Sequence, residues 1–153
     1  MLGLRLLEEF VHASDFLSAR FRSRGNRPAH LELGRRGEEA AYFYLRRHGF
    51  TVVARDWRSG KAPGDLDLVA WENNVLCFIE VKTRTTREVA TAESAVDESK
   101  RRTLRKIARH YLRHLPEPAG IRFDVVAIYF ESDIPADFTL FKGVFGWSEK
   151  PGY

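Results

Sequence analysis

The sequence predicts one mixed α/β (α+β) domain in which helices flank a central mixed β-sheet. Two stretches repeat apolar residues at helical spacing, and five others have the alternating or continuous apolar pattern of strands. They follow one another as helix, three strands, helix and two strands, an order that favours a single sheet. A chain of 153 residues, 44% of them hydrophobic and 30% charged, is long enough for one such core.

The first helix is expected over residues 31–48, because Gly49 follows it as a typical helix-ending residue. Three extended runs come next, at 50–54, 65–71 and 75–82. Asn73 and Asn74 separate the last two runs and form a pair that tolerates positive φ. These two runs are therefore predicted to make a β-hairpin.

A second helix is expected over residues 96–115, where Leu104, Ile107 and Tyr111 fall on one apolar stripe. Most of the arginines of this segment are expected on its other face. Two further strands, at 121–130 and 138–145, complete the predicted sheet.

The predicted domain spans residues 31–147. Residues 1–30 are expected to form an amphipathic helix and a basic linker, and residues 148–153 a C-terminal tail. No apolar run approaches the roughly 18 residues of a membrane span, and Glu8 and Glu9 interrupt the apolar N-terminus, unlike a signal peptide. A cytoplasmic protein that does not contact a membrane is expected.

Basic residues are concentrated in the second predicted helix. The net charge is +4 and the pI about 9.4, which favours polyanionic partners such as DNA. Seven basic residues and no acidic one lie between residues 100 and 113. Two interpretations of this run stay open, a surface that faces phosphates and an ordinary solvated helix face.

The predicted hairpin brings charged residues together at its open end. If its turn is Asn73-Asn74, paired residues across the strands sum to 147, so that Asp67 lies opposite Glu80 and Asp65 opposite Lys82. The opposite face is expected to be core and carries Leu66, Leu68, Ala70, Val75, Cys77, Ile79 and Val81.

Directly opposed carboxylates destabilise a sheet, so the pair formed by Asp67 and Glu80 predicts a bound cation. Carboxylate oxygens with retained waters are what Mg²⁺ prefers, and Mn²⁺ accepts the same ligands. Lys82 would lie beside that metal, where its ammonium could hold a phosphate oxygen or a nucleophilic water. The alternative is a set of solvated strand-end charges in which Lys82 pairs with Asp65.

Asp67 followed by Glu80-Val81-Lys82 resembles the D…(D/E)-x-K signature of the restriction-endonuclease-like superfamily. The surrounding motifs, in order and spacing, resemble the YraN-type family of small bacterial proteins, which look similar to archaeal Holliday junction resolvases. These motifs are Gly37-Glu38, Arg55-Asp56-Trp57-Arg58, Gly64-Asp65-Leu66-Asp67-Leu68-Val69, Phe78 to Arg84, Ala95 to Lys100, and Arg122-Phe123-Asp124-Val125.

The resemblance implies a three-layer, restriction-endonuclease-like core. It also implies that Glu38, Asp67 and Glu80 hold the metal while Lys82 assists the attacking water, so that all four are catalytic. Where the family typically has Gly-Glu-Ile-Asp, this chain has Gly64-Asp65-Leu66-Asp67. That departure leaves open whether Asp65 takes part in the site.

Two further residues have two interpretations each. Glu38 is in helical register with Ala41 and Leu45, so it is expected to face the body, either as a metal ligand or as an acid favoured by the helix N-terminus. Lys100 extends the apolar stripe of the second helix, either to contact phosphate or as a snorkelling lysine. The predicted nucleic-acid contacts are Arg58, Arg84, Lys100, Arg101 and Arg105.

Together these features predict a magnesium- or manganese-dependent endonuclease that cuts DNA, including branched or otherwise structured DNA. A non-catalytic nucleic-acid-binding module with the same fold is one alternative. A protein-interaction partner in a DNA repair or uptake complex, docking through its N-terminal helix, is another. A homodimer formed through that helix also stays open.

Overall fold

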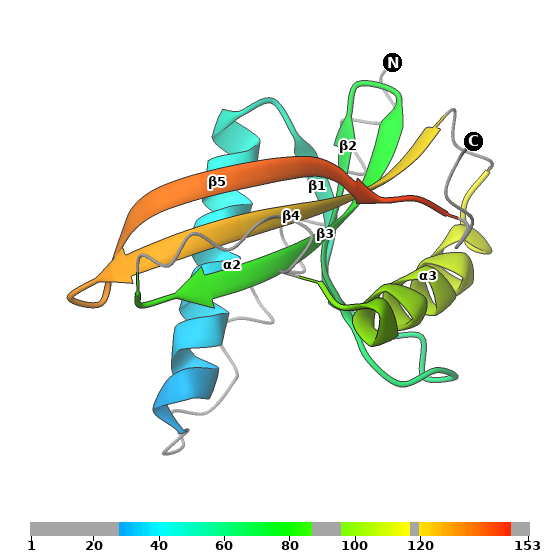
Figure 1. Cartoon of the computed structure of the whole chain (residues 1–153). Coiled ribbons are helices and arrows are strands. Elements are labelled where there is room, and N and C mark those ends of the chain that lie inside the picture. The colour runs from blue at the N-terminus through cyan, green and yellow to red at the C-terminus, as the bar shows by residue number, and fades with distance from the viewer. Residues whose placement is uncertain (1–27, 87–95, 117–119, 148–153) are drawn as a thin grey trace.

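The computed structural model has a five-stranded sheet with one helix on each face, among the residues that it describes, 28–86, 96–116 and 120–147 (Figure 1). The elements are α2 (Ala29–Arg47), β1 (Thr51–Trp57), β2 (Leu66–Glu72), β3 (Val75–Arg84), α3 (Glu98–Leu112), β4 (Gly120–Glu131) and β5 (Ile134–Phe145). Their order confirms the predicted fold class. The predicted N-terminal segment (1–30) and C-terminal tail (148–153) lie outside these residues, except that residues 28–30 are described and include the start of α2.

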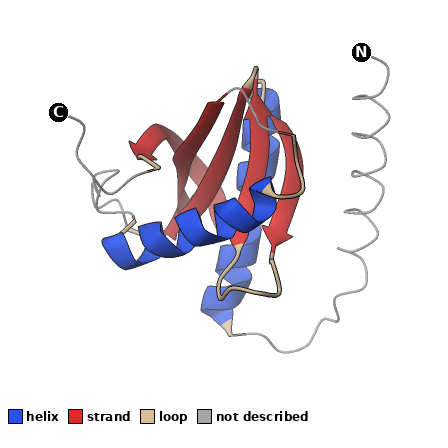
Figure 2. Cartoon of the chain, turned by 90° about the vertical axis from the view of Figure 1, so that its right-hand side faces the viewer, coloured by secondary structure: helices blue, strands red, loops and turns tan. Residues whose placement is uncertain are grey.

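The strands lie side by side in the order β1-β2-β3-β4-β5. Strands β3 and β4 are parallel, whereas the other neighbours are antiparallel. A parallel pair needs a crossover connection, and α3 supplies it. Figure 2 shows α3 lying across one face of the sheet and α2 behind the other. The result is the expected three-layer arrangement.

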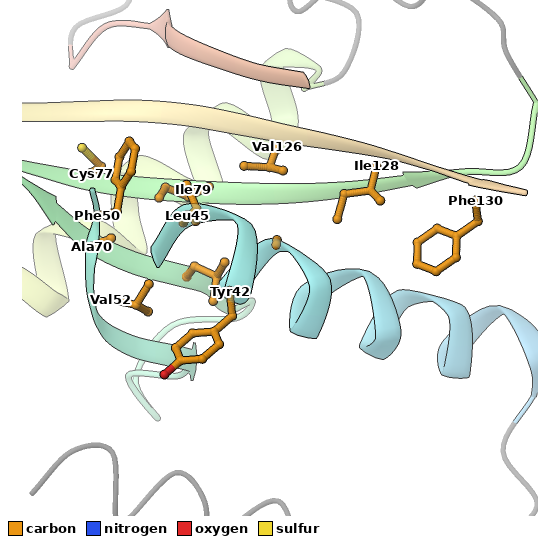
Figure 3. Close-up of a cluster of buried hydrophobic side chains, with 12 residues drawn as sticks. Tyr42, Leu45, Phe50, Val52, Ala70, Cys77, Ile79, Val126, Ile128 and Phe130 are labelled. Carbon is orange, nitrogen blue, oxygen red and sulfur yellow. The ribbon is translucent and has the colours of Figure 1, made fainter. Parts of the chain in front are cut away.

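Each face of the sheet has its own apolar core. Ala41 and Leu45 of α2 pack on one face against residues that include Ile79 and Val126 (Figure 3). Leu104 and Ile107 of α3 pack on the other face, in a cluster of Leu66, Val69, Leu76, Phe78, Val96, Ala108, Phe123 and Val125. Both faces of the hairpin are therefore buried over most of its length.

The predicted hairpin register is confirmed from Glu72↔Val75 to Leu68↔Ile79. Asn73 has a φ of 52°, the positive value that its residue type tolerates. Leu66 is buried as predicted, but it does not share a face with Leu68: Leu66 packs in the cluster under α3, whereas Leu68 packs under α2. The backbone ladder between β2 and β3 ends at Leu68, so the alternation of faces that it enforces does not extend to Leu66.

Strand β5 begins at Ile134, four residues before the predicted start at 138. Pro135 and Asp137 concealed this part of the strand, since both residue types are rare in sheet interiors. Strand β5 is at the sheet edge, where proline is tolerated. A tight turn at Ser132 and Asp133, with φ of 48° and 64°, joins it directly to β4.

A network of charges ties the strands together at the end of the sheet away from the open end of the hairpin. Asp124 on β4 is 1% exposed and accepts hydrogen bonds from the Arg122 guanidinium at 2.8 and 2.9 Å. Arg122 also donates to Glu72 on β2 at 2.7 Å, and the Gly143 N–H of β5 donates to Asp124 at 2.9 Å. The buried charge is thus paired and hydrogen-bonded, as burial requires.

Gly37 allows α2 to approach β3 closely. A Cβ at this position would overlap the Cγ2 methyl of Thr83, whereas a Cβ at Gly34, one turn earlier, would meet nothing within 4 Å. The close approach places the next residue, Glu38, over the open end of the hairpin.

We expect Gly37→Ala to lower the free energy of unfolding by about 1–3 kcal/mol, because the added methyl forces α2 away from the sheet. Gly34→Ala, on the same helix, should raise it by about 0.5–1 kcal/mol through helix propensity alone. Urea denaturation measures both. Thr83→Ser removes the overlapping methyl and should recover part of the Gly37→Ala loss. Equal effects of the two alanines would contradict the close approach.

Candidate functional site

Asp67 lies where β2 and β3 separate. The paired backbone ladder ends at Leu68↔Ile79, one residue before the predicted pair of Asp67 and Glu80. Instead, the Asp67 Oδ2 atom accepts the backbone N–H of Val81 at 2.8 Å. The carboxylate replaces the missing strand carbonyl as the acceptor for that N–H. This hydrogen bond fixes Asp67 beside the segment that carries Glu80 and Lys82.

Glu80 is a buried carboxylate between two lysines. It is 4% exposed. Lys82, on the same strand, places its Nζ atom 2.9 Å from Glu80 Oε1, and Lys100, in the first turn of α3, places its Nζ atom 3.3 Å from Oε2. The Asp97 side chain caps α3 by accepting the Lys100 N–H at 2.8 Å, which fixes that turn. A lysine from β3 and a lysine from α3 thus meet at one carboxylate.

The Oε2 atom of Glu80 is incompletely satisfied. Lys100 contacts it at 3.3 Å, a long and poorly aligned contact for a hydrogen bond, and no other donor in the described part of the chain reaches it. A buried charged oxygen with one long ion pair can still accept a further ligand. Its position points to a ligand at this end of the hairpin.

Burial raises the pKa of Asp67 to about 7, and repulsion from the Glu80 charge adds to this effect. The hydrogen bond from Val81 opposes the shift. For Lys100, burial disfavours the charged form, but attraction to Glu80 and Asp67 outweighs it, so the pKa of Lys100 lies above its ordinary value. Lys100 is therefore a permanent cation at neutral pH.

Glu38 projects from α2 and is hydrogen-bonded to Asp56 of β1. Burial, the bond to Asp56 and the charges of Asp56 and Asp67 raise the pKa of Glu38 to about 8. Asp56 has a φ of 46°, a left-handed conformation that aspartate tolerates better than most residues.

Asp56 is a member of the cluster that the sequence analysis missed. The pairs Arg55↔Leu68 and Trp57↔Leu66 place it at the level of Asp67 on the neighbouring strand. The first strand was predicted to end at residue 54, whereas β1 continues to Trp57. Extending that strand and adding the register of β1 on β2 would have revealed Asp56.

The structure brings together four predicted site residues: Asp67, Glu80, Lys82 and Lys100. Glu38 is paired with Asp56 instead, and the described residues contain no group of three Asp, Glu, His or Cys side chains that could by themselves hold a metal ion. The predicted three-carboxylate set is thus not assembled. Mg²⁺, however, usually binds through one or two carboxylates, several waters and substrate phosphates, and Asp67 with the Oε2 atom of Glu80 fits that donor set.

Asp65 does not pair with Lys82. Its Oδ2 atom lies 3.2 Å from the Arg58 guanidinium, and Lys82 contacts Glu80. The charge of Asp65 still raises the pKa of both Glu38 and Asp67. Asp65 therefore contributes to the field of the site from its edge.

Arg105 is buried, contrary to the expectation that it lies on the outward face of its helix. It is 5% exposed, and its guanidinium donates to Gly146 O at 3.0 Å and Glu98 at 3.1 Å. The aromatic ring of Phe145 lies beneath it. Residues after β5 cover this side of α3, which the helical pattern alone does not reveal.

Two other predicted nucleic-acid contacts also have intrachain partners. Arg101 donates to Val96 O at 2.9 Å, and Arg84 donates to Thr83 O at 3.3 Å. The Arg58 side chain is also paired, with Asp65, but it is 72% exposed. Of the predicted contacts, Arg58 and Lys100 lie best placed for a ligand at the open end of the hairpin.

The fold and the site define a class of small α+β proteins. In this class a cluster of carboxylates and lysines lies where strands β2 and β3 separate. The sequence matches the description "Uncharacterised protein family UPF0102" over residues 37–128. The chain belongs to this family, UPF0102, also called the YraN family, which confirms the resemblance found in its motifs.

Three relatives illustrate the match. A UPF0102 protein of Koribacter versatilis is 52% identical over 144 residues, covering 94% of this chain and 92% of the relative. A UPF0102 protein of Solibacter usitatus is 44% identical over 65% of this chain and 76% of its own length. One of Porphyromonas gingivalis is 39% identical over 68% of this chain and 76% of its own length.

No helix in the described ranges has the length and apolar character needed to cross a membrane.

We expect Asp67→Asn to stabilise the protein in EDTA, increasingly so as pH rises from about 4 to about 7, with little further change above that. The pKa of Asp67 is raised in the fold, so the wild type is relatively stable below the ordinary value of 3.8 and loses that stability as the carboxyl ionises near pH 7. Asparagine still accepts the Val81 N–H but carries no charge. The gain should be on the order of 1–2 kcal/mol at pH 8, because solvent screening reduces the full effect.

Urea denaturation at pH 5 and pH 8 measures this difference. Asp133→Asn is the charge-matched control, since the Asp133 side chain is 85% exposed, and it should show no comparable dependence on pH. A destabilised Asp67→Asn at pH 8 would show that Asp67 and Glu80 do not repel each other.

Proposed function

We propose that this protein is a metal-dependent endonuclease that hydrolyses phosphodiester bonds in DNA. The observation that carries the proposal is the buried Glu80 carboxylate, held between Lys82 and Lys100 and next to Asp67. Burying a charge is costly, and placing a second carboxylate beside it adds repulsion. Such an arrangement weakens a sheet, but it suits the binding of a cation and a phosphate together.

Asp67 and Glu80 would hold Mg²⁺ or Mn²⁺, with Glu38 as the third candidate ligand from α2. The Asp67 carboxylate is already fixed by the Val81 N–H, which leaves its other oxygen for a ligand. A bound divalent metal would lower the pKa of a coordinated water and neutralise charge on the phosphate in the transition state.

The two lysines would supply positive charge on either side of the reacting phosphate. The Nζ atom of Lys82 lies 2.9 Å from one Glu80 oxygen, and the Nζ atom of Lys100 lies 3.3 Å from the other. Lys100 stays protonated at neutral pH, so its role would be to bind an anionic oxygen rather than to accept a proton. Lys82 would orient the attacking water or stabilise the developing charge.

Asp56 and Glu38 would act at the α2 side of the site. Their hydrogen bond keeps Glu38 beside the sheet, and the raised pKa of Glu38 means that the carboxyl retains a proton near neutral pH. Glu38 would have to lose this proton to act as the third metal ligand, so the protonated form, which can donate a hydrogen bond to a water, belongs to the site without metal.

The surface around the site favours a polyanion. Exposed cations continue from the site along α3, at Lys106 and Arg109, and the β1–β2 loop adds Arg58 and Lys61. Together with the net charge of +4, this distribution supports binding to the backbone phosphates of DNA. The cytoplasm, where DNA is accessible, is the proposed compartment.

A nucleic-acid-binding module without turnover is the second candidate. It is favoured by the pairing of Glu38 with Asp56, which leaves the three-carboxylate set unassembled. A protein partner in DNA repair or uptake, or a second copy of the chain, engaging through residues 1–30 would be compatible with either candidate.

We expect cleavage of labelled DNA that requires Mg²⁺ or Mn²⁺ and falls at least 100-fold in Asp67→Asn and in Lys82→Ala, since each removes a group that would act on the reacting phosphate. Linear, flap and four-way-junction substrates cover duplex and branched DNA. Asp133→Asn is the surface control and should retain full activity.

Absence of cleavage of every substrate with both metals would sink the nuclease proposal, as would activity unaffected by either substitution. DNA binding in EDTA, combined with no cleavage of any substrate in Mg²⁺ or Mn²⁺, would support the binding module instead.

A further inference from the structure

The loop between β1 and β2 surrounds a hollow beside the proposed site. The hollow has a volume of about 570 Å³ and is lined by Arg58 and by residues from Gly60 to Asp65. Asp65 lines the hollow and is close enough to raise the pKa of Glu38 and Asp67, so the hollow lies at the edge of the carboxylate cluster. In Figure 1 the loop lies beneath α3, at the end of the sheet where β1 and β2 meet that helix.

Local contacts fix the shape of this loop. The Ser59 Oγ atom accepts the backbone N–H groups of Lys61 at 3.1 Å and Ala62 at 3.0 Å. Gly64 has a φ of 95°, and a Cβ there would lie 2.8 Å from the Cγ2 atom of Thr103 on α3. Only glycine permits both this conformation and this approach. The loop is therefore held against α3 in a defined shape.

The charges of the hollow favour an anion. Its one acidic lining residue, Asp65, is ion-paired with Arg58 at 3.2 Å, which leaves the charge of Lys61 in excess. Arg58 and Lys61 are both exposed, so their cations stand at the rim. Ala62 and Pro63 add an apolar side. A rim of cations around an apolar surface suits a group with a phosphate and a flat ring.

We propose that this hollow is a subsite for one unpaired nucleotide of the substrate strand, next to the phosphate that is cleaved. Its phosphate would contact Lys61 and Arg58, and its base would lie against Ala62 and Pro63. The proposal rests on the nuclease function proposed above. The volume is within the range of roughly 300–1,000 Å³ of small-ligand sites, enough for one nucleotide.

Two features select an unpaired nucleotide within a longer strand. Most of the lining residues are exposed, so the hollow is open to solvent and suits part of a polymer rather than an enclosed small molecule. In a duplex the bases are stacked and paired, so a duplex would offer the rim its phosphates but could not place a base inside. The subsite therefore predicts a preference for DNA with a single-stranded flank.

We expect the double variant Arg58→Ala/Lys61→Ala to weaken binding to flap DNA about tenfold more than binding to a blunt duplex. Both substrates lose phosphate contacts, but only in the flap do the two cations hold the phosphate of a nucleotide whose base lies in the hollow. Fluorescence anisotropy in EDTA measures affinity without cleavage. Arg47→Ala, which removes an exposed cation at the end of α2, is the charge control and should leave the flap preference intact.

A second pair of variants tests the shape of the loop with no change in charge. Gly64→Ala combines backbone strain with the 2.8 Å approach to Thr103, whereas Gly49→Ala, at a φ of 86°, has nothing within 4 Å. Gly64→Ala should lose the flap preference, and Gly49→Ala should retain it. Thr103→Ser removes the methyl that Gly64→Ala would strike, so the double variant should recover part of the preference.

Equal affinity of the wild type for flap and duplex would overturn the subsite, and so would equal losses for both substrates in Arg58→Ala/Lys61→Ala. These outcomes do not depend on cleavage. Selective flap binding by a protein that cuts nothing would leave the subsite standing and remove the nuclease proposal. Metal-dependent cleavage without a preference for flap DNA would support the nuclease proposal and remove the subsite.

Discussion

The burial of the Glu80 carboxylate constrains the rest of the site. A charge at 4% exposure requires compensation, and Lys82 and Lys100 supply it from the same strand and from the first turn of α3. The Asp97 cap fixes that turn, so the start of α3 is tied to the open end of the hairpin. The burial of Asp67 itself and, secondly, the charge of Glu80 raise the pKa of Asp67 to about 7. One buried carboxylate therefore links the position of a helix to the ionisation of a neighbour.

Around this carboxylate the sheet departs from regular structure in ways that lower stability. The β2–β3 ladder ends at Leu68, and the Asp67 side chain takes the place of a backbone acceptor. Asp56 adopts a positive φ, and position 37 is a glycine, whose missing side chain lets α2 approach the sheet closely. Such local departures are typical of functional sites, where geometry is maintained at the expense of stability. The regular parts of the sheet, with a buried core on each face, offset them.

Much of this arrangement could be predicted because strand pairing follows simple arithmetic. The turn at Asn73 fixed the hairpin register, and the register placed Asp67 near Glu80. What the sequence concealed depends on neighbours that are distant in the chain. Asp56 was missed because β1 continues beyond its apolar residues, and Arg105 is buried by residues after β5. The pairing of Glu38 with Asp56 likewise depends on how α2 lies across β1, which no local pattern encodes.

Membership of UPF0102 places the chain among bacterial relatives, and the site geometry gives a specific chemical hypothesis for it. We propose that Asp67 and Glu80 bind a divalent cation where β2 and β3 separate. Anomalous diffraction from crystals of the protein soaked in Mn²⁺ tests it most directly, because it locates the metal without any need for a substrate. We expect a manganese peak between these two carboxylates, absent from crystals of Glu80→Gln. A peak elsewhere, or none at this position at saturating Mn²⁺, would contradict it.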